Sequence, residues 1–311
     1  MDGQVVIAAR TFGRSDAQGA EILRKAGLQL VYLPGKAPAG TELAELMRDN
    51  QTVAVIAGGE PITADMILNS PNLKVIAMHG AGLNHIDQEA VKSRNILLRG
   101  VPGGNAEAVA DLTFGLMLAV ARHIVIADAS IRQHEWGTFM GSSIYEKTLG
   151  IIGFGAIGQA VACRAAGFSM KILTYDVVID RNALLKLSVE SVPLEELLEN
   201  SDFVTLHVPL TTETTNLINA EAIRKMKKSA ILINISRGGV VDESALCQAL
   251  LEGLIAGAGI DTFSKEPLPV DNCLRSIPNL VMTPHIGGRT REAIASIGIE
   301  AARIVLEGLE T

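Results

Sequence analysis

The sequence predicts an α/β protein with two doubly wound, Rossmann-like parallel sheets, in which the second domain is inserted into the first. Three observations predict this fold. Short apolar stretches alternate with helical patterns over the first hundred residues, a glycine-rich fingerprint begins only near the middle of the chain, and a second alternation follows it. Strands that alternate with helices form parallel sheets with helices on both faces. A chain of 311 residues has room for about two such domains.

The first alternation defines the elements of the first domain. Strands are expected at 4–8, 53–57, 74–78 and 96–98, and helices at 17–26, 42–50, 64–70 and 88–94. A further helix, expected at 292–306 near the end of the chain, is too short to be a domain. We therefore expect this last helix to pack back on the first domain.

A long helix is expected at 106–127, where the residues read AEAVADLTFGLMLAVARHIVIA. This segment is apolar nearly all round. Such a helix must be buried, either between domains or between subunits. The segment therefore favours a homodimer formed through this helix.

The second alternation begins at the glycine-rich fingerprint. Strands are expected at 149–152, 171–175, 203–208, 230–235, 256–260 and 281–283, and helices at 192–199, 220–225 and 243–251. These strands are enough for one sheet of six or seven strands.

Composition excludes several classes of function. The formal net charge of −7 predicts no general affinity for nucleic acid or for an anionic membrane. No apolar run is long enough to span a membrane, and the N-terminus lacks the pattern of a signal peptide. Cys163, Cys247 and Cys273 are scattered, without a C-x-x-C pair, which predicts reduced, packed thiols, no metal site and a cytoplasmic location.

The run at 153–158 reads G-x-G-x-x-G and has the context of a dinucleotide-binding fingerprint. It follows a buried strand pattern and opens a helical pattern. Gly153 permits the tight turn out of the strand, Gly155 lets the backbone approach a pyrophosphate, and Gly158 lets the helix pack close to the sheet. The N-terminus of the helix then offers N–H groups and a positive dipole end to the phosphates.

An acidic residue, Asp176, closes the next strand pattern. Its carboxylate can accept hydrogen bonds from both ribose hydroxyls and would repel a 2′-phosphate. Neither Val177 nor Val178 is an arginine that could offset this repulsion. The sequence therefore predicts NAD as the cofactor, in preference to NADP.

Three charged or titratable residues follow predicted strands in the last third of the chain. Hydride transfer to a 2-oxo acid needs a cation for the carboxylate, an acid that protonates the carbonyl oxygen, and a partner that keeps that acid protonated. Arg237, Glu266 and His285 supply one candidate for each need. Ligands of open α/β sheets bind outside the carboxyl ends of the strands, so these loops are expected at the active site.

These motifs resemble those of the D-isomer-specific 2-hydroxyacid dehydrogenases, in the branch that includes phosphoglycerate dehydrogenase. The resemblance covers essentially the whole chain and rests on S-R-G-G at 236–239, E-P at 266–267, P-H-I-G at 284–287 and L-H-V-P-L-T at 206–211. It implies that Arg237 binds the substrate carboxylate and carbonyl, that His285 is the acid/base, and that Glu266 pairs with it.

The resemblance also implies a two-domain organisation and a set of binding residues. Residues 1–100 with 285–311 would form a flavodoxin-like substrate-binding domain, and 101–284 the NAD-binding Rossmann domain. The glycine-rich loop after the strand at 74–78 would bind the substrate carboxylate. The implied substrate-binding residues are His79, Gly80, Ala81, Gly82 and Arg237, and the implied cofactor-binding residues are Gly153, Gly155, Ala156, Ile157, Gly158, Asp176, His207, Val208, Pro209, Thr214, Ile235, Ser236, Asp261, His285 and Gly287.

The substrate stays open at this stage. A D-3-phosphoglycerate dehydrogenase is the first expectation, but the loops at 57–61 and 78–80 carry no arginine or lysine to meet a phosphate. His79 or Arg99 would have to supply that charge. A hydroxypyruvate or glyoxylate reductase is therefore an alternative, as are phosphite or formate oxidation on the same fold and a non-catalytic, NAD(H)-sensing protein similar to corepressors.

Overall fold

The computed structural model describes residues 2–33 and 39–310, which fall into two compact units. Unit 1 contains the residues up to Asn105 together with those from Arg289 onward, and unit 2 runs from Ala106 to Gly288. Both units are parallel-sheet α/β folds of the Rossmann type, as the sequence predicts. The unit boundaries lie four or five residues beyond the predicted ones at 100/101 and 284/285. We describe each unit separately.

Unit 1 contains a five-stranded sheet in the order β2-β1-β3-β4-β5, with all neighbours parallel. This is the strand order of flavodoxin-like folds. Its strands are β1 (Gln4–Ile7), β2 (Gln29–Tyr32), β3 (Thr52–Ala57), β4 (Val75–Met78) and β5 (Leu97–Arg99), and its helices are α1 (Gln18–Lys25), α2 (Ala39–Arg48), α3 (Ala64–Leu68), α4 (Gln88–Ser93) and α12 (Arg291–Glu310).

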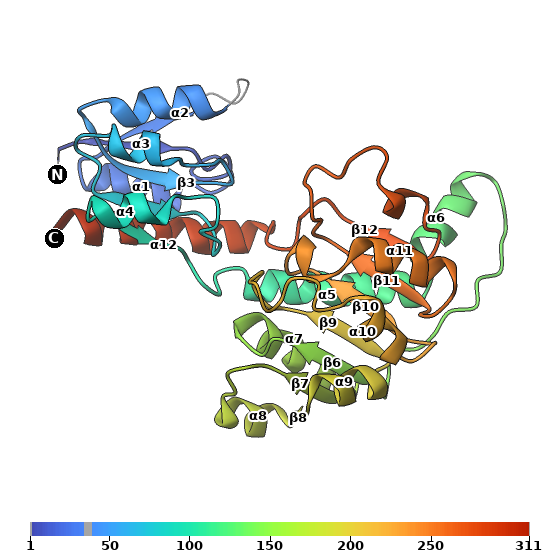
Figure 1. Cartoon of the computed structure of the whole chain (residues 1–311). Helices are drawn as coiled ribbons and strands as arrows, with labels where there is room; N and C mark the ends of the chain where they lie inside the picture. The colour runs from blue at the N-terminus through green and yellow to red at the C-terminus, as the bar shows by residue number, and fades with distance from the viewer. Residues whose placement is uncertain (1, 34–38, 311) are drawn as a thin grey trace. The chain divides into compact units, whose positions relative to one another are not determined.

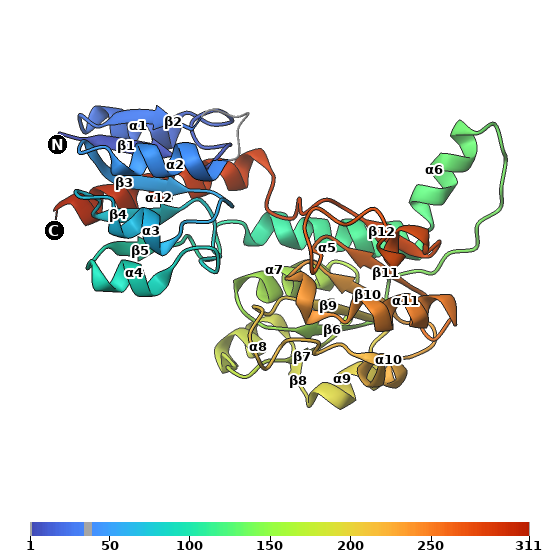
Figure 2. The same ribbon diagram turned by 45° about the horizontal axis from the view of Figure 1, so that its top comes forward.

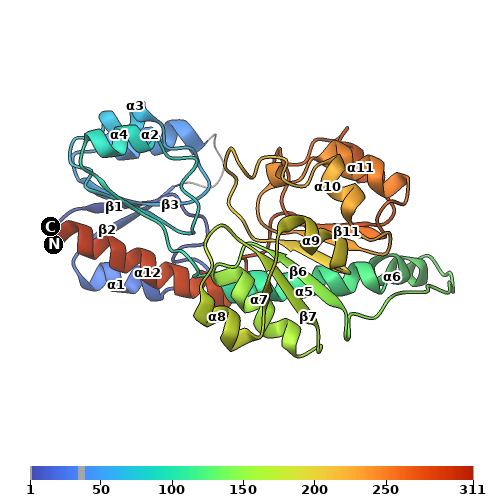
Figure 3. The same cartoon turned by 60° about the horizontal axis from the view of Figure 1, so that its bottom comes forward.

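Helices cover both faces of this sheet. In Figure 3, α2, α3 and α4 lie on one face, and α1 and α12 lie on the other. The last helix, α12, packs against α1, β3 and β4 through buried residues such as Ile297 and Ala301. Gly19 permits this packing, because a Cβ atom there would collide with the carbonyl group of Gly298 on α12. The chain thus returns to unit 1 after completing unit 2 (Figure 1).

Unit 2 contains a seven-stranded parallel sheet in the order β12-β11-β10-β9-β6-β7-β8. Counted from β6, this is the doubly wound order of dinucleotide-binding folds, extended by one strand. The strands are β6 (Thr148–Ile152), β7 (Lys171–Tyr175), β8 (Glu190–Ser191), β9 (Phe203–Leu206), β10 (Ile231–Asn234), β11 (Gly257–Ile260) and β12 (Leu280–Met282). The helices are α5 (Ala106–Ala121), α6 (Ile124–Arg132), α7 (Ala156–Ala166), α8 (Arg181–Leu187), α9 (Leu194–Asn200), α10 (Ala220–Lys225) and α11 (Glu243–Leu251), with two 3₁₀ turns, η1 (Gly238–Val240) and η2 (Cys273–Ser276).

Two separate cores fill the two sides of this sheet. One lies beneath α5 and α7, and the other beneath α9, α10 and α11. Figure 2 shows α6 projecting away from the sheet of unit 2, followed by an extended segment that returns to β6. Because all seven strands are parallel, their carboxyl ends lie at one edge of the sheet. The loops that carry the predicted site residues of unit 2 therefore gather at this edge.

The prediction of a single helix at 106–127 is wrong in one respect, because the structure has two helices there, α5 and α6. His123 has a left-handed backbone (φ 56°) and separates α5 from α6. α5 is mostly buried, as its apolar sequence predicts, whereas Ile124, Val125 and Ile126 on α6 are exposed. In the described residues, no helix alone has the length and apolar character that crossing a membrane requires. Only when α5 and α6, bent by 63° at their junction, are taken together do they meet the requirements of length and apolar character.

The prediction of three reduced, packed cysteines is also wrong. Cys247 on α11 and Cys273 at the start of η2 form a disulfide, and Cys163 is exposed. The two bonded cysteines are 26 residues apart in sequence, and they meet because α11 packs against η2. Their spacing in the sequence contains no sign of this packing.

Candidate active site

The predicted acid/base and its partner form a hydrogen-bonded pair at the carboxyl edge of unit 2. His285 follows β12, and its Nδ1 lies 2.8 Å from Oε2 of Glu266. A carboxylate can only accept, so Nδ1 carries the proton of this bond. Nε2 makes no hydrogen bond that the described residues provide, and the side chain is 47 % exposed. This arrangement leaves Nε2 available for proton exchange with a ligand.

Glu266 is itself held in place. Its second oxygen, Oε1, accepts a hydrogen bond of 3.0 Å from the backbone N–H of Phe263. The carboxylate therefore closes the turn from Phe263 to Glu266 and at the same time orients the ring of His285. The glutamate end of the pair is thus fixed by local structure.

Asp261 fixes the loop that carries His285. It follows β11 and is only 1 % exposed. Its carboxylate accepts hydrogen bonds from the Thr283 hydroxyl (2.6 Å) and from the backbone N–H groups of Ile286 and Gly287 (2.8 Å each). Its carbonyl oxygen accepts from the N–H of His285 at 2.9 Å. The predicted contact of Asp261 with the cofactor stays a prediction, and the structure adds a positioning role.

Arg237 follows β10, the strand next to β11. Asn234 organises its loop: its Oδ1 accepts from the N–H and the hydroxyl of Ser236, and its Nδ2 donates to the Arg237 carbonyl at 2.9 Å. Gly238 lets this loop approach the next one, because a Cβ atom there would collide with the backbone of Phe263. The strand order β10-β11-β12 thereby gathers the loops of all three predicted catalytic residues. Sequence reasoning missed Asn234, although a polar residue that ends a buried strand is a recognisable sign.

The glycine fingerprint forms a cradle between β6 and α7. Gly153 has φ 97°, and a Cβ atom there would collide with the carbonyl of His207. A Cβ atom at Gly158 would collide with the carbonyl of Gly153, so α7 packs close to the turn. Gly155 instead faces open space and begins α7 without a side-chain cap. Uncapped N–H groups at the start of a helix suit a pyrophosphate, so the cradle fits NAD.

Asp176 follows β7, next to this cradle. Its Oδ2 accepts from the N–H of Phe154 inside the glycine turn, and its Oδ1 accepts from the N–H of Val178 at 3.0 Å. Each carboxylate oxygen can accept a further bond. The structure therefore gives Asp176 a role in shaping the turn, and its predicted hydrogen bonds to the ribose stay a prediction.

His207 leaves β9 beside the same turn. Burial lowers its pKa to about 3, so the ring is neutral. Its Nε2 lies 3.0 Å from the Thr205 hydroxyl, while Nδ1 is buried without a partner in the residues described. The next residues turn sharply, because the Thr214 hydroxyl donates to the Pro209 carbonyl at 2.6 Å. Two other predicted cofactor residues, Ala156 and Ile157, begin α7. The remaining ones lie in the loops described here: Val208, Ile235, Ser236 and Gly287.

The predicted substrate loop belongs to unit 1. It follows β4 and runs through His79, Gly80, Ala81 and Gly82. The ring of His79 packs edge-on against Phe12 at a centroid distance of 5.8 Å, and burial lowers its pKa. Arg99 pairs with Glu307 at 2.7 Å. Burial thus disfavours the charged form of His79, and its predicted contact with the substrate stays a prediction.

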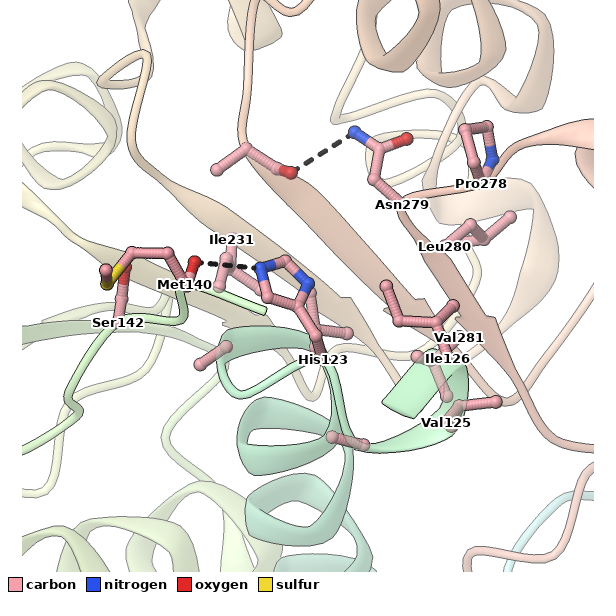
Figure 4. A pocket seen from close by; sticks show the side chains of 14 residues that line it. His123, Val125, Ile126, Met140, Ser142, Ile231, Pro278, Asn279, Leu280 and Val281 are labelled. Carbon is pink, nitrogen blue, oxygen red and sulfur yellow. Dashed lines mark hydrogen bonds between the residues drawn. The ribbon is translucent and has the colours of Figure 1, made fainter. Parts of the chain in front are cut away.

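A separate cavity of about 240 Å³ in unit 2 lies at the amino ends of β10, β11 and β12 (Figure 4). It is lined mainly by apolar side chains at the junction of α5 and α6. His123 Nε2 lies 3.2 Å from the Met140 carbonyl at its wall. The cavity is therefore at the opposite edge of the sheet from His285. Within the described ranges, no three His, Cys, Asp or Glu side chains are grouped to hold a metal ion.

Comparison with known proteins agrees with this geometry. A family model described as "D-isomer specific 2-hydroxyacid dehydrogenase, NAD binding domain" matches residues 114–287. A glyoxylate reductase of Korarchaeum cryptofilum is 45 % identical over 239 residues, which cover 75 % of this chain and 72 % of the relative. A hydroxypyruvate reductase of Thermotoga maritima is 44 % identical over 262 residues, which cover 83 % and 84 %.

Two further similarities extend the comparison. A D-3-phosphoglycerate dehydrogenase of Methanocaldococcus jannaschii is 44 % identical over 273 residues, 86 % of this chain but only 52 % of that protein. The crystal structure of the TT0316 protein from Thermus thermophilus superposes with a TM-score of 0.90 at 36 % identity, covering 99 % of this chain and 97 % of that one.

Proposed function

Because the chain belongs to the D-isomer-specific 2-hydroxyacid dehydrogenases and is an NAD-dependent oxidoreductase, we propose that it reduces small, unphosphorylated 2-oxo acids, hydroxypyruvate and glyoxylate in particular. The observation that carries this proposal is the pair of His285 Nδ1 and Glu266 Oε2, 2.8 Å apart, in loops next to that of Arg237. Dehydrogenation of D-3-phosphoglycerate, the first expectation from the sequence, is the alternative that the experiment below tests.

Arg237, His285 and Glu266 have different roles in the proposed reduction. Arg237 would grip the substrate carboxylate with its planar guanidinium, which matches two carboxylate oxygens better than a lysine can. When bound, NADH supplies the hydride that reduces the carbonyl carbon. His285 gives the proton on Nε2 to the carbonyl oxygen, so that a hydroxyl forms, and Glu266 keeps the ring oriented through Nδ1. In the oxidative direction Nε2 takes the hydroxyl proton back.

A panel of 2-oxo acids tests this proposal. The purified enzyme with NADH should consume the cofactor on addition of hydroxypyruvate or glyoxylate, and much more slowly on addition of 3-phosphohydroxypyruvate. The measurement is the loss of NADH absorbance under initial-rate conditions. NADH binding without turnover of any 2-oxo acid would instead support a non-catalytic NAD(H) sensor. Turnover of phosphite or formate in place of 2-oxo acids would contradict the proposal.

We also propose that the protein forms a homodimer, now through α6 rather than through the whole helix predicted at 106–127. The large apolar side chains of α6 and the segment after it are exposed: Ile124, Val125, Ile126, Ile131, Trp136, Phe139, Met140 and Tyr145. Exposed apolar surface of this extent is typical of protein interfaces. A second copy that covers α6 and this segment would remove it from water.

Solution mass tests the homodimer. Ile131→Asp on α6 should convert a dimer of twice the chain mass into a monomer, measured by size exclusion with light scattering, because burying the new charge is costly. Leu185→Asp on α8 is the matched control, since Leu185 is also exposed and should leave the mass unchanged. A monomeric wild-type protein, or equal dissociation in the control, would disprove this interface. The cytoplasmic location also stays a prediction, which cell fractionation tests.

A further inference from the structure

We propose that Glu243 is a positioning residue for the reduction, because its carboxylate holds the turn that presents Glu266 to His285. The inference rests on the proposed function and adds a residue outside the three predicted catalytic ones. All the residues concerned belong to unit 2. Three observations support it: the hydrogen bonds of Glu243 to the turn, the exposure of that turn, and the separate capping of the helix that carries Glu243.

Glu243 reaches from the first residue of α11 into the segment between β11 and η2. Its Oε1 accepts a hydrogen bond of 2.6 Å from the backbone N–H of Ser264, and its Oε2 accepts one of 3.1 Å from Nδ2 of Asn272. Hydrogen bonds to a charged acceptor are about twice as strong as those between neutral groups. The carboxylate therefore ties both ends of the segment 264–272 to α11.

The bond to Ser264 lies inside the turn that Glu266 closes. The N–H of Phe263 donates to Oε1 of Glu266 at 3.0 Å, and Oε2 of the same carboxylate lies 2.8 Å from Nδ1 of His285. Of the side chains that the structure describes, only Glu243 forms a hydrogen bond to the backbone of this turn from another element. A series of hydrogen bonds therefore runs from α11 through the turn to the imidazole.

Packing alone holds this turn only at its ends. Phe263 and Leu268 are partly buried against the core of unit 2, whereas the residues at 264–267 between them are exposed. Exposed backbone with few buried apolar contacts opens at a low cost in free energy. The position of Glu266 therefore depends on the hydrogen bonds of the turn, including the one to Glu243.

The helix α11 does not need Glu243 as its cap. Asp242 is the N-cap residue, and its Oδ1 accepts from the N–H groups of Ser244 and Ala245 at 3.0 Å each. An acidic side chain in the first turn also interacts favourably with the helix dipole, but this effect requires no bond to a distant loop. The hydrogen bonds of the Glu243 side chain are therefore directed at the turn rather than at its own helix.

The disulfide between Cys247 and Cys273 is a second connection between α11 and this part of the chain. Cys247 lies one helical turn after Glu243, on the same face of α11. Cys273 begins η2, so the disulfide fixes the far end of the segment. At the end that carries Glu266, the described residues connect the turn to α11 through the bond between Glu243 and Ser264.

The first test compares the wild-type enzyme with Glu243→Ala, Glu243→Gln and Glu252→Ala in the reduction of hydroxypyruvate by NADH. Glu243→Ala should lower kcat about tenfold, because even a small misplacement of a catalytic group is costly. The KM for hydroxypyruvate and the Kd for NADH should change little. Glu243→Gln should recover part of the loss, since its amide oxygen can still accept from Ser264. Glu252→Ala is the matched control on the same helix, because its carboxylate bonds only to Gln248 of α11 in the described structure, and it should leave kcat unchanged.

A double-mutant cycle separates positioning from general stabilisation. If Glu243 acts through Glu266, Glu243→Ala should cost little more in a Glu266→Ala background, whereas independent effects would multiply. A further loss of about tenfold in that background would overturn the inference. So would an unchanged kcat in Glu243→Ala, or an equal loss of kcat in Glu252→Ala.

The tautomer of His285 gives a readout that needs no turnover. In alkaline solution an imidazole is neutral, and the hydrogen bond made by one ring nitrogen decides which nitrogen keeps the proton. Long-range proton–nitrogen NMR spectra of protein labelled at the histidine nitrogens, assigned with His285→Ala, should show Nδ1–H in the wild type and in Glu252→Ala. Glu243→Ala should shift the ring toward the Nε2–H tautomer, and an unchanged tautomer would overturn the inference. A wild-type protein that shows this shift on substitution but reduces no 2-oxo acid would contradict the proposed function and still support the positioning of His285.

Discussion

Replacing His285 by alanine should lower kcat for reduction of a 2-oxo acid by about 10²–10⁴-fold, the usual contribution of a positioned general acid. The reason is geometric. Nδ1 is held by Glu266 at 2.8 Å, and Nε2 is the ring atom left to deliver a proton to the carbonyl oxygen. Stopped-flow single turnovers with NADH and hydroxypyruvate measure the loss directly.

Two controls separate catalysis from folding in this variant. NADH binding, followed by fluorescence titration, should persist, because the glycine cradle between β6 and α7 does not depend on the imidazole. Glu266→Gln should reduce kcat by a smaller factor, since it disturbs the orientation of the ring but leaves the proton donor in place. Full turnover in the His285→Ala variant would rule out His285 as the acid.

The fold was predictable where each strand carries its own signal. The buried runs that became β6, β7, β9, β10 and β11 are continuous and apolar, as parallel strands covered on both faces must be. The strand β2 was not predicted, because it is an edge strand whose residues are only partly buried or exposed. The two-residue strand β8 was likewise not predicted, and it is an edge strand of the seven-stranded sheet of unit 2. Nor was the helix α8, which directly precedes this strand in the chain.

The features that depend on tertiary packing were not predictable from sequence patterns. The break at His123 uses a left-handed conformation at a non-glycine residue, with no glycine or proline to announce it. The disulfide between Cys247 and Cys273 depends on the packing of α11 against η2.

The candidate site likewise has a part that could be predicted from the sequence and a part that could not. The loops of Arg237, Glu266 and His285 were predictable, because each follows a strand and parallel strands share one carboxyl edge. The supports of these loops were not: Asn234 and Asp261 act through hydrogen bonds to backbone groups of other loops.

Arg237 is where the second large effect is expected. Arg237→Ala should lower kcat/KM for a 2-oxo acid by about 10²–10⁴-fold, since two hydrogen bonds from a charged group contribute about 1.5–3 kcal/mol each. Arg237→Lys should recover only part of this loss, because an ammonium keeps the charge but cannot present two parallel N–H groups. Initial rates over a range of hydroxypyruvate concentrations measure both variants.

We expect the loop of Arg237 to keep its conformation in both variants. A loss of activity would then report on the missing guanidinium and not on a disordered loop. Asn234 holds the loop through the backbone carbonyl of Arg237 and through Ser236, and the guanidinium itself makes one hydrogen bond, from Nη1 to the Ser236 carbonyl at 2.7 Å. The thermal unfolding midpoint and NADH affinity should therefore change little. Added guanidinium should restore part of the turnover of Arg237→Ala but not of His285→Ala. Unchanged kcat/KM in Arg237→Lys would show that a point charge is sufficient, and equal rescue of both alanine variants would contradict a specific carboxylate clamp.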